Sequence, residues 1–199
     1  MRERYRHVTS YTIAWILIGV TMTGLALSIR LTTDNHWLEW HLSRLGEGST
    51  VAAAVFNFSL TLAALIIAWL GTRVSDEVDG YQPHPGVVKL RTLLMFVAVC
   101  WAGVAAFPFD KFHVLHNIFG YAQFLAIGYM MLWLKHLCPR FSDRTYYIGY
   151  VAAISTGLLM GLFHLIHFMT LLTVELVGQL FIYAWVLSMT YDQRQHLQK

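Results

Sequence analysis

Charged residues are scarce in this chain of 199 residues. Asp, Glu, Lys and Arg together make up 13% of it, whereas a soluble globular domain carries about 25%. The chain also has only two cysteines and four prolines, too few for a disulfide scaffold or a collagen-like sequence. These shortages exclude a soluble globule, a disulfide-stabilised fold, a disordered chain and a free nucleic-acid-binding protein.

Hydrophobic residues make up 57% of the chain, and its mean hydropathy is +0.52. They gather in six runs close to the length of about 20 residues with which a helix spans a bilayer. We therefore predict an all-α, polytopic membrane protein: one domain over residues 1–199, built as a bundle of six transmembrane helices. The predicted spans are 10–29, 49–70, 89–107, 112–134, 146–168 and 171–189. We expect the first to be a retained helix and not a signal peptide.

The basic residues predict how these helices are oriented. With six spans, eleven of the fourteen lysines and arginines fall on the side of the two termini, and only Arg30, Arg44 and Lys111 fall on the other side. By the positive-inside rule, both termini are cytoplasmic, in a multi-pass protein of the plasma (inner) membrane. The segment from Thr72 to Val88, rich in Asp, Gly and Pro, is expected to be a cytoplasmic loop.

Six of the ten histidines map to the predicted outer side. Four of them form two His-x-x-His pairs at the outer ends of spans four and five, His113 with His116 and His164 with His167. Residues three apart share a face of an α-helix, so each pair can direct two imidazoles at one point.

Carboxyl and amide groups accompany these histidines. Asp110 precedes His113 by one turn, Glu175 lies about one turn into span six, and Asn57 lies two turns into span two. Polar groups at membrane depth usually face the bundle interior or a water-filled cavity. We therefore expect the four histidines to converge with these residues on one cavity that opens outward.

Imidazole and carboxylate groups are ligands that Zn²⁺ prefers, and a bound zinc ion supplies hydroxide near neutral pH. This favours a metal-dependent hydrolase of lipid or lipid-linked substrates. His113, His116, His164 and His167 are the predicted ligands, and Asp110 or Glu175 is a further ligand or the general base. Ser43 and Asn57 would orient the substrate.

Two other functions are open at this point. One histidine from each of two facing helices can ligate a b-type haem, with Trp101, Tyr121 and Phe163 as candidates to line it. Alternatively, the polar groups form a wet vestibule in a non-enzymatic subunit or a small-solute or proton-linked carrier. In that case Asp110 and Glu175 serve as helix caps. The expected partners are membrane lipids, and a second membrane protein or further copies of the chain.

The loop between spans one and two is rich in apolar residues. Trp37 and Trp40 are expected to anchor it at the membrane interface as part of an aromatic belt. Small residues inside the spans, among them Gly19, Gly24, Gly157 and Gly161, are expected to allow close helix contacts.

Three short motifs resemble a known family. They are His41-Leu42-Ser43-Arg44-Leu45-Gly46, then Ala54-Val55-Phe56-Asn57, and finally Phe107-Pro108-Phe109-Asp110 followed by His116. This pattern is similar to the DUF998 family of prokaryotic six-helix membrane proteins, and distantly to the Frag1/DRAM group. The resemblance implies the six-span fold, leaves the activity open, and selects Ser43, Asn57, Asp110 and His116 as site residues.

Overall fold

The computed structural model describes residues 8–34, 36–39, 41–81, 85–167 and 169–197. Every regular element in this part of the chain is helical, and six helices are long and apolar enough to cross a membrane. The long helices are α1 Ser10–Leu31, α2 Val51–Tyr81, α3 Pro85–Ala106, α4 Phe109–Leu137, α5 Asp143–Gly161 and α6 Leu171–Leu197. Three short helices accompany them: η2 His36–Glu39, η3 Leu42–Gly46 and the π-helical η4 Leu162–Ile166. The all-α class and the multi-pass character are thus confirmed.

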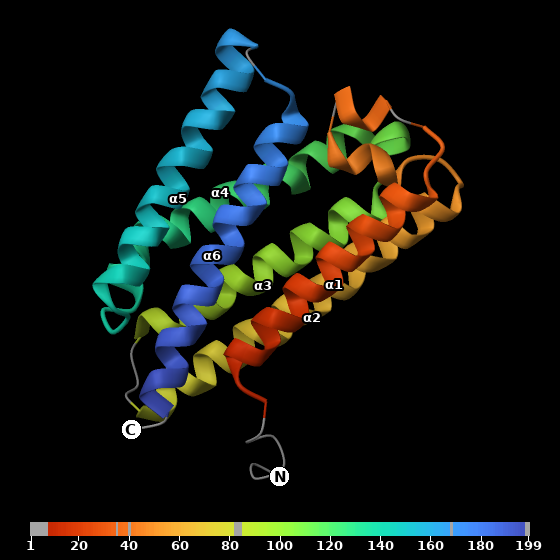
Figure 1. Cartoon of the computed structure of the whole chain (residues 1–199). Coiled ribbons are helices and arrows are strands. Elements are labelled where there is room, and N and C mark those ends of the chain that lie inside the picture. Colours follow the sequence, from red (N-terminus) through yellow and green to blue (C-terminus); the bar gives the residue numbers. More distant parts are fainter. Residues whose placement is uncertain (1–7, 35, 40, 82–84, 168, 198–199) are drawn as a thin grey trace.

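The six helices form a bundle in which each helix contacts the next along the chain, and α1 also contacts α6 (Figure 1). Helix α1 begins and α6 ends at the same end of the bundle, where Ser10 Oγ donates a hydrogen bond to Gln193 Oε1 at 2.9 Å. We call the opposite end the distal end. It carries η2, η3, the turn between α3 and α4, and the connection between α5 and α6.

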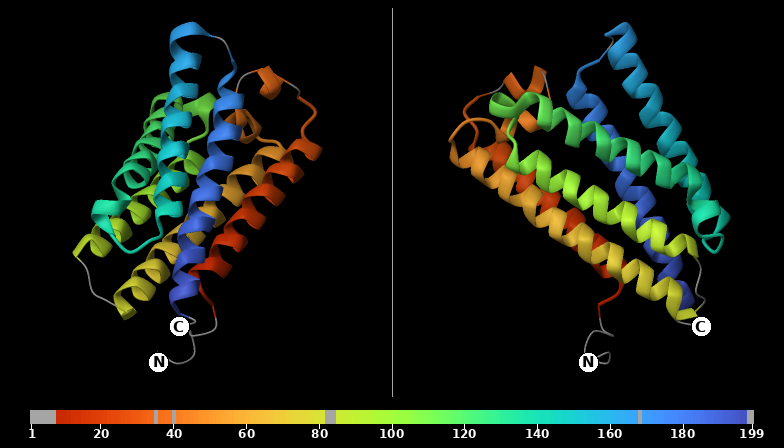
Figure 2. Two further views of the ribbon diagram at one scale, coloured as in Figure 1. Left: turned by 60° about the vertical axis from the view of Figure 1, so that its left-hand side comes forward. Right: turned by 180° about the vertical axis from the view of Figure 1, so that it is seen from behind.

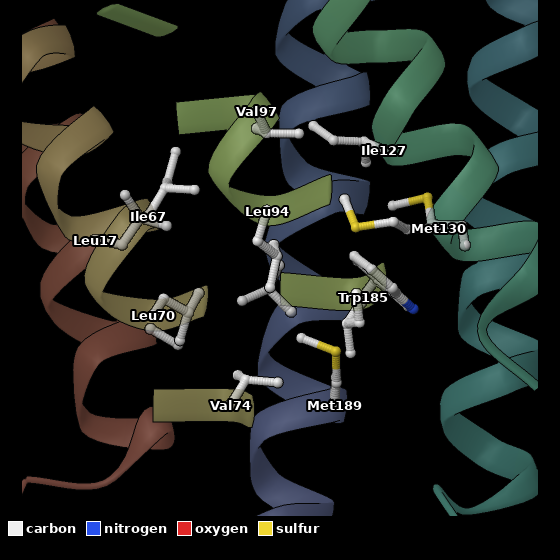
Figure 3. Close-up of a cluster of buried hydrophobic side chains, with 14 of the residues drawn as sticks. Leu17, Ile67, Leu70, Val74, Leu94, Val97, Ile127, Met130, Trp185 and Met189 are labelled. Atoms are coloured by element: carbon white, nitrogen blue, oxygen red, sulfur yellow. The ribbon is translucent and has the colours of Figure 1, made fainter. Parts of the chain in front are cut away.

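Buried apolar side chains fill the bundle on the side of the termini (Figure 3). Leu17 of α1, Leu70 of α2, Leu94 of α3, Met130 of α4 and Trp185 of α6 meet there, and each is at most 5% exposed. Helix α5 stands to one side (Figure 2), and four of its residues are buried: Thr145, Tyr146, Gly149 and Ala152. Tyr146 and Ala152 of α5 belong to this core, and no residue of α5 beyond Ala152 is buried.

Helix α2 runs further than the sequence predicts. The expected loop covers Thr72 to Val88, but α2 continues to Tyr81 and α3 begins at Pro85, so this prediction is wrong for residues 72–81 and 85–88. The reason for the longer α2 is a tertiary contact: Glu77 is 5% exposed and accepts a hydrogen bond from the backbone N–H of Ser10 at 2.9 Å. Arg73 lies 3.5 Å from the same carboxylate. These partners offset the cost of burying the charge and hold the polar end of α2 against α1.

The distal ends of α4 and α5 depart from regular α-helix. Helix α4 begins at Phe109, one residue after Pro108, and Phe112 has non-helical dihedral angles (φ −135°, ψ 45°) that kink the first turns. Helix α5 ends at Gly161 and continues as the π-helix η4, after which His167 takes a left-handed conformation with φ 53°. Span five is therefore α-helical only to Gly161 and not to residue 168.

Candidate functional site

A cavity of about 70 Å³, lined by both polar and apolar side chains, lies at the distal end between η3, α3, α4, α5 and α6. We call it the chamber. Its polar lining residues come from segments far apart in the sequence: His41, Ser43, His116, Asn117, Gln123 and Glu175. Aromatic rings of Phe109, Tyr121 and Phe124 complete the wall.

His116 is held in place by the turn that precedes its own helix. It is 6% exposed, and its Nδ1 lies 2.9 Å from the carbonyl oxygen of Phe107. Because a carbonyl oxygen only accepts hydrogen bonds, Nδ1 carries a hydrogen atom and is the donor of this hydrogen bond. The ring of Phe109 packs edge-on against the imidazole, with 5.7 Å between centroids. The segment Phe107-Pro108-Phe109 thus orients this histidine toward the chamber.

His41 enters the chamber from the residue before η3. It is 6% exposed, its ring lies 4.8 Å from that of Phe109 between centroids, and its Nε2 has no hydrogen-bond partner. Burial, followed by the charges of His116 and Arg44, lowers the pKa of His41 to about 4. The imidazole is therefore neutral at pH 7. The sequence identified His41 only as one of six outer histidines and gave it no role.

Glu175 connects the chamber to the segment between α1 and α2, which we call the distal segment; its described residues are 32–34, 36–39 and 41–50. Its Oε2 accepts a hydrogen bond from the backbone N–H of Leu42, the first residue of η3, at 2.6 Å. The side chain does not cap its own helix, because Thr170 Oγ1 accepts the backbone N–H of Thr173 at the start of α6, at 3.4 Å. The contact places a carboxylate on the chamber wall and fastens η3 to α6.

Further cavities adjoin the chamber, directly or through one another. One of them, of about 430 Å³ and mainly apolar, lies between α4, α5 and Ile182 of α6, and shares Tyr121, Phe124 and Met160 with the chamber.

Two others lead in a different direction. A passage of about 90 Å³ shares Ser43, Gln123 and Glu175 with it and continues past Trp101 and Gln179. The passage shares those last two residues with a larger, mainly apolar cavity of about 300 Å³, which we call the tail cavity. Its lining residues come from α1, α2, α3, α6 and η3: Thr21, Met22, Leu25, Leu42, Phe56, Ser59, Leu60, Trp101, Leu176, Gln179, Leu180 and Tyr183.

The tail cavity reaches the surface of the bundle between α1 and α6. Met22 of α1 and Leu180 of α6 both line it, and they are 47% and 61% exposed. In a bilayer, this surface would face lipid. The chamber, the passage and the tail cavity together thus lead from the lipid-facing side of the bundle to a polar end beneath η3.

Three buried polar atoms along this route have no hydrogen-bond partner: His41 Nε2, Gln123 Oε1 and Trp101 Nε1. Buried polar groups in proteins are nearly always hydrogen-bonded, to protein, water or ligand. Three such atoms along one route therefore indicate that a bound molecule or water supplies the missing partners.

Of the predicted site residues, the structure brings Ser43, His116 and Glu175 together in the chamber. Asn57 and Asp110 do not line the chamber and instead bind the backbone of the distal segment. Asn57 Nδ2 donates to the carbonyl oxygen of Gly46 at 2.9 Å, and Asp110 Oδ2 accepts from the backbone N–H of Gly48 at 3.3 Å. They fix the end of the distal segment to α2 and α4.

The other three histidines do not join the site. His113, His164 and His167 are exposed, and none of them lines the chamber. His164 and His167 do not form the predicted pair on one helix face, because η4 is π-helical and His167 has a left-handed backbone conformation. Within the described ranges, no group of three His, Cys, Asp or Glu side chains could hold a metal ion. The residues thus do not fit a zinc site, and zinc and haem stay predictions.

The distal segment is a folded cap and not an interfacial loop. Trp37 is 8% exposed and packs with Leu45, Phe56 and Leu172, so its predicted place in an aromatic belt is wrong. Trp40, the second predicted anchor, lies outside the described residues. Trp37 and Leu45 of this segment thus form a small apolar cluster with α2 and α6, and Leu42 lines the passage and the tail cavity.

No family model, curated protein or solved structure matches this chain. The resemblance to the DUF998 family therefore stays a prediction. The function has to be argued from the cavities and the residues that line them.

Proposed function

We propose that this protein binds a single-chain amphiphile taken from the membrane. The polar head occupies the chamber, and the hydrocarbon chain passes Trp101 and lies in the tail cavity. One observation carries the proposal: the chamber, the passage and the tail cavity adjoin one another, with polar residues at one end and apolar residues at the other.

The size and chemistry of the cavities support this proposal. At about 300 Å³, the tail cavity reaches the lower end of the usual range for small-molecule sites, which suits one chain better than two. The unpartnered atoms His41 Nε2 and Gln123 Oε1 lie at the polar end, where a head group would supply their partners. The exposed residues Met22 and Leu180 mark the side from which the chain would enter.

The proposal is for binding and includes no hydrolysis. The metal-dependent hydrolase predicted from the sequence needs a ligand group that the described residues do not offer. Binding without chemistry agrees with the alternative of a carrier or subunit. We also propose the orientation that the basic residues predict, with both termini in the cytoplasm and the chamber toward the outer leaflet.

Quenching of tryptophan fluorescence tests the binding. The protein is placed in phosphatidylcholine nanodiscs and titrated with a dodecyl amphiphile that is brominated at the chain end. Because Trp101 lines the passage and the tail cavity, we expect a saturable loss of fluorescence as the probe fills the site.

Two matched variants identify the site. Trp101→Phe is expected to remove the saturable component. Trp133→Phe removes a tryptophan that is 47% exposed and lines the cavity between α4 and α5 instead, and it is expected to leave that component intact. If wild-type protein shows only linear quenching, or if Trp101→Phe quenches like wild type, the proposed binding is wrong.

A further inference from the structure

The charge of the cavities restricts the head group. Among the described residues that line the chamber, the passage and the tail cavity, there is no lysine or arginine, and Glu175 is the single acidic side chain. Sites for phosphate or carboxylate groups usually present arginine or lysine. The lining therefore does not suit an anionic head.

The nearby basic side chains do not change this balance. The Nε of Arg44, beside His41 on the distal segment, lies 3.9 Å from a carboxylate oxygen of Asp34. Burial and the neighbouring charges lower the pKa of His41 to about 4, so its ring is neutral at pH 7. The Nδ1–H group of His116 donates a hydrogen bond to the carbonyl oxygen of Phe107. Neither Arg44 nor His41 therefore places an unpaired positive charge beside Glu175.

Glu175 and Gln123 together present acceptors to this space. The carboxylate of Glu175 has two oxygens, and one backbone N–H, that of Leu42, bonds to Oε2. An enclosed carboxylate is costly unless it is paired. Gln123 Oε1 is a buried acceptor with no partner, and it lines the same two cavities as Glu175. A ligand with several N–H donors and a positive charge would satisfy both side chains.

Aromatic rings surround these acceptors. Phe109, Tyr121 and Phe124 line the chamber with Glu175. The face of an aromatic ring attracts a cation, so these rings add to the preference for positive charge.

We propose that the chamber takes the ammonium group of a long-chain amine, with the Glu175 carboxylate as its counter-ion and Gln123 Oε1 as a second acceptor. This inference rests on the proposed function, because the chain of the amine occupies the tail cavity. It names the head-group class that the proposed function leaves open.

Four brominated dodecyl probes that differ only in the head group test the inference. The heads are ammonium, alcohol, carboxylate and phosphate, and saturable quenching in nanodiscs gives the affinity of each. Since a hydrogen bond to a charged group contributes about 1.5–3 kcal/mol, we expect the ammonium probe to bind about tenfold or more tighter than the alcohol. The anionic probes are expected to bind more weakly than the alcohol.

Substitutions attribute the preference to named side chains. In Glu175→Gln the advantage of the ammonium over the alcohol is expected to disappear, while the alcohol keeps its affinity. Glu39→Gln is the matched control, because it removes one exposed negative charge from the distal end without touching the cavities. Gln123→Leu is a second variant, expected to weaken the ammonium probe more than the alcohol, and it keeps the test decisive if Glu175→Gln fails to fold.

The outcomes separate this inference from the proposed function. Saturable quenching in which the ammonium does not exceed the alcohol, or in which an anionic probe binds best, overturns the ammonium assignment and leaves amphiphile binding in place. An ammonium preference that persists in Glu175→Gln also overturns it. Absence of saturable quenching with all four probes rejects the proposed function itself.

Discussion

His41 is buried against the ring of Phe109 at the point where the distal segment meets α4. A histidine at this position was not selected from the sequence, because neighbours in the chain give no sign that Phe109 and His116 will enclose it. The burial has a consequence for the stability of the segment, since protonation of this imidazole is disfavoured in the folded state.

We therefore expect the distal segment to loosen as the pH falls. The pKa of His41 is about 4 in the folded protein and 6.5 in an unfolded chain, so between these values the unfolded segment binds more protons. The contribution to stability is full above pH 6.5 and is lost as the pH falls toward 4. Hydrogen exchange of the backbone amides of residues 41–47, corrected for intrinsic rates, is expected to accelerate across this window.

Two comparisons isolate the contribution of His41. His41→Phe is expected to remove the acceleration, whereas His113→Phe, which changes an exposed histidine, is expected to keep it. Burial raises the pKa of Glu47 in the same segment. Its protonation therefore stabilises the folded segment as the pH falls, opposite to the effect of His41, and this contribution is present in both variants. Exchange that accelerates equally in wild type and His41→Phe would show that another group is responsible.

At the scale of the element, Gly24 is the one of the four glycines named from the sequence at which two helices pack closely. A Cβ atom at Gly24 of α1 would meet the Oγ and Cβ atoms of Ser59 on α2, whereas at Gly19, Gly157 and Gly161 there is nothing within 4 Å. The Gly-x-x-x-Gly pair on α5 thus makes no close helix contact in the described part of the chain. Spacing alone could not distinguish these cases, because it does not say which helix face meets a neighbour.

Gly24→Ala is expected to lower the stability of the protein by about 1–3 kcal/mol, the usual cost of overpacking. Gly19→Ala, in the same helix, has open space and is expected to be neutral or stabilising by about 0.5–1 kcal/mol. Thermal unfolding in detergent measures both variants against wild type. Equal melting temperatures for the two variants would mean that α1 and α2 are not closely packed at Gly24.

At the scale of the whole molecule, the ring of helices places the start of α1 and the end of α6 at one end of the bundle and the chamber at the other. The count of basic residues predicts which end of the bundle faces the cytoplasm. The fold shows only that the chamber lies at the end opposite to the start of α1.

Cysteine labelling in intact cells tests this orientation. Ser49→Cys at the distal end is expected to react with a membrane-impermeant maleimide from outside, and Asp143→Cys only after the cells are permeabilised. Both positions are exposed, and wild type is the control because Cys100 and Cys138 are buried. The reverse pattern would place the termini outside.

The sequence by itself determined the class of the protein and the approximate position of six spans. Hydrocarbon admits only long apolar helices or closed barrels, so the length and composition of each run suffice. It also named three residues of the chamber: His116 and Glu175 as polar residues near the outer ends of the predicted spans, and Ser43 through the family resemblance. Only the tertiary structure decided that the chamber excludes His113, His164 and His167 and includes His41 and Gln123. The rotation of each helix, the π-helical end of α5 and the folding of the distal segment over α6 arise from packing between distant segments, and no local pattern encodes those contacts.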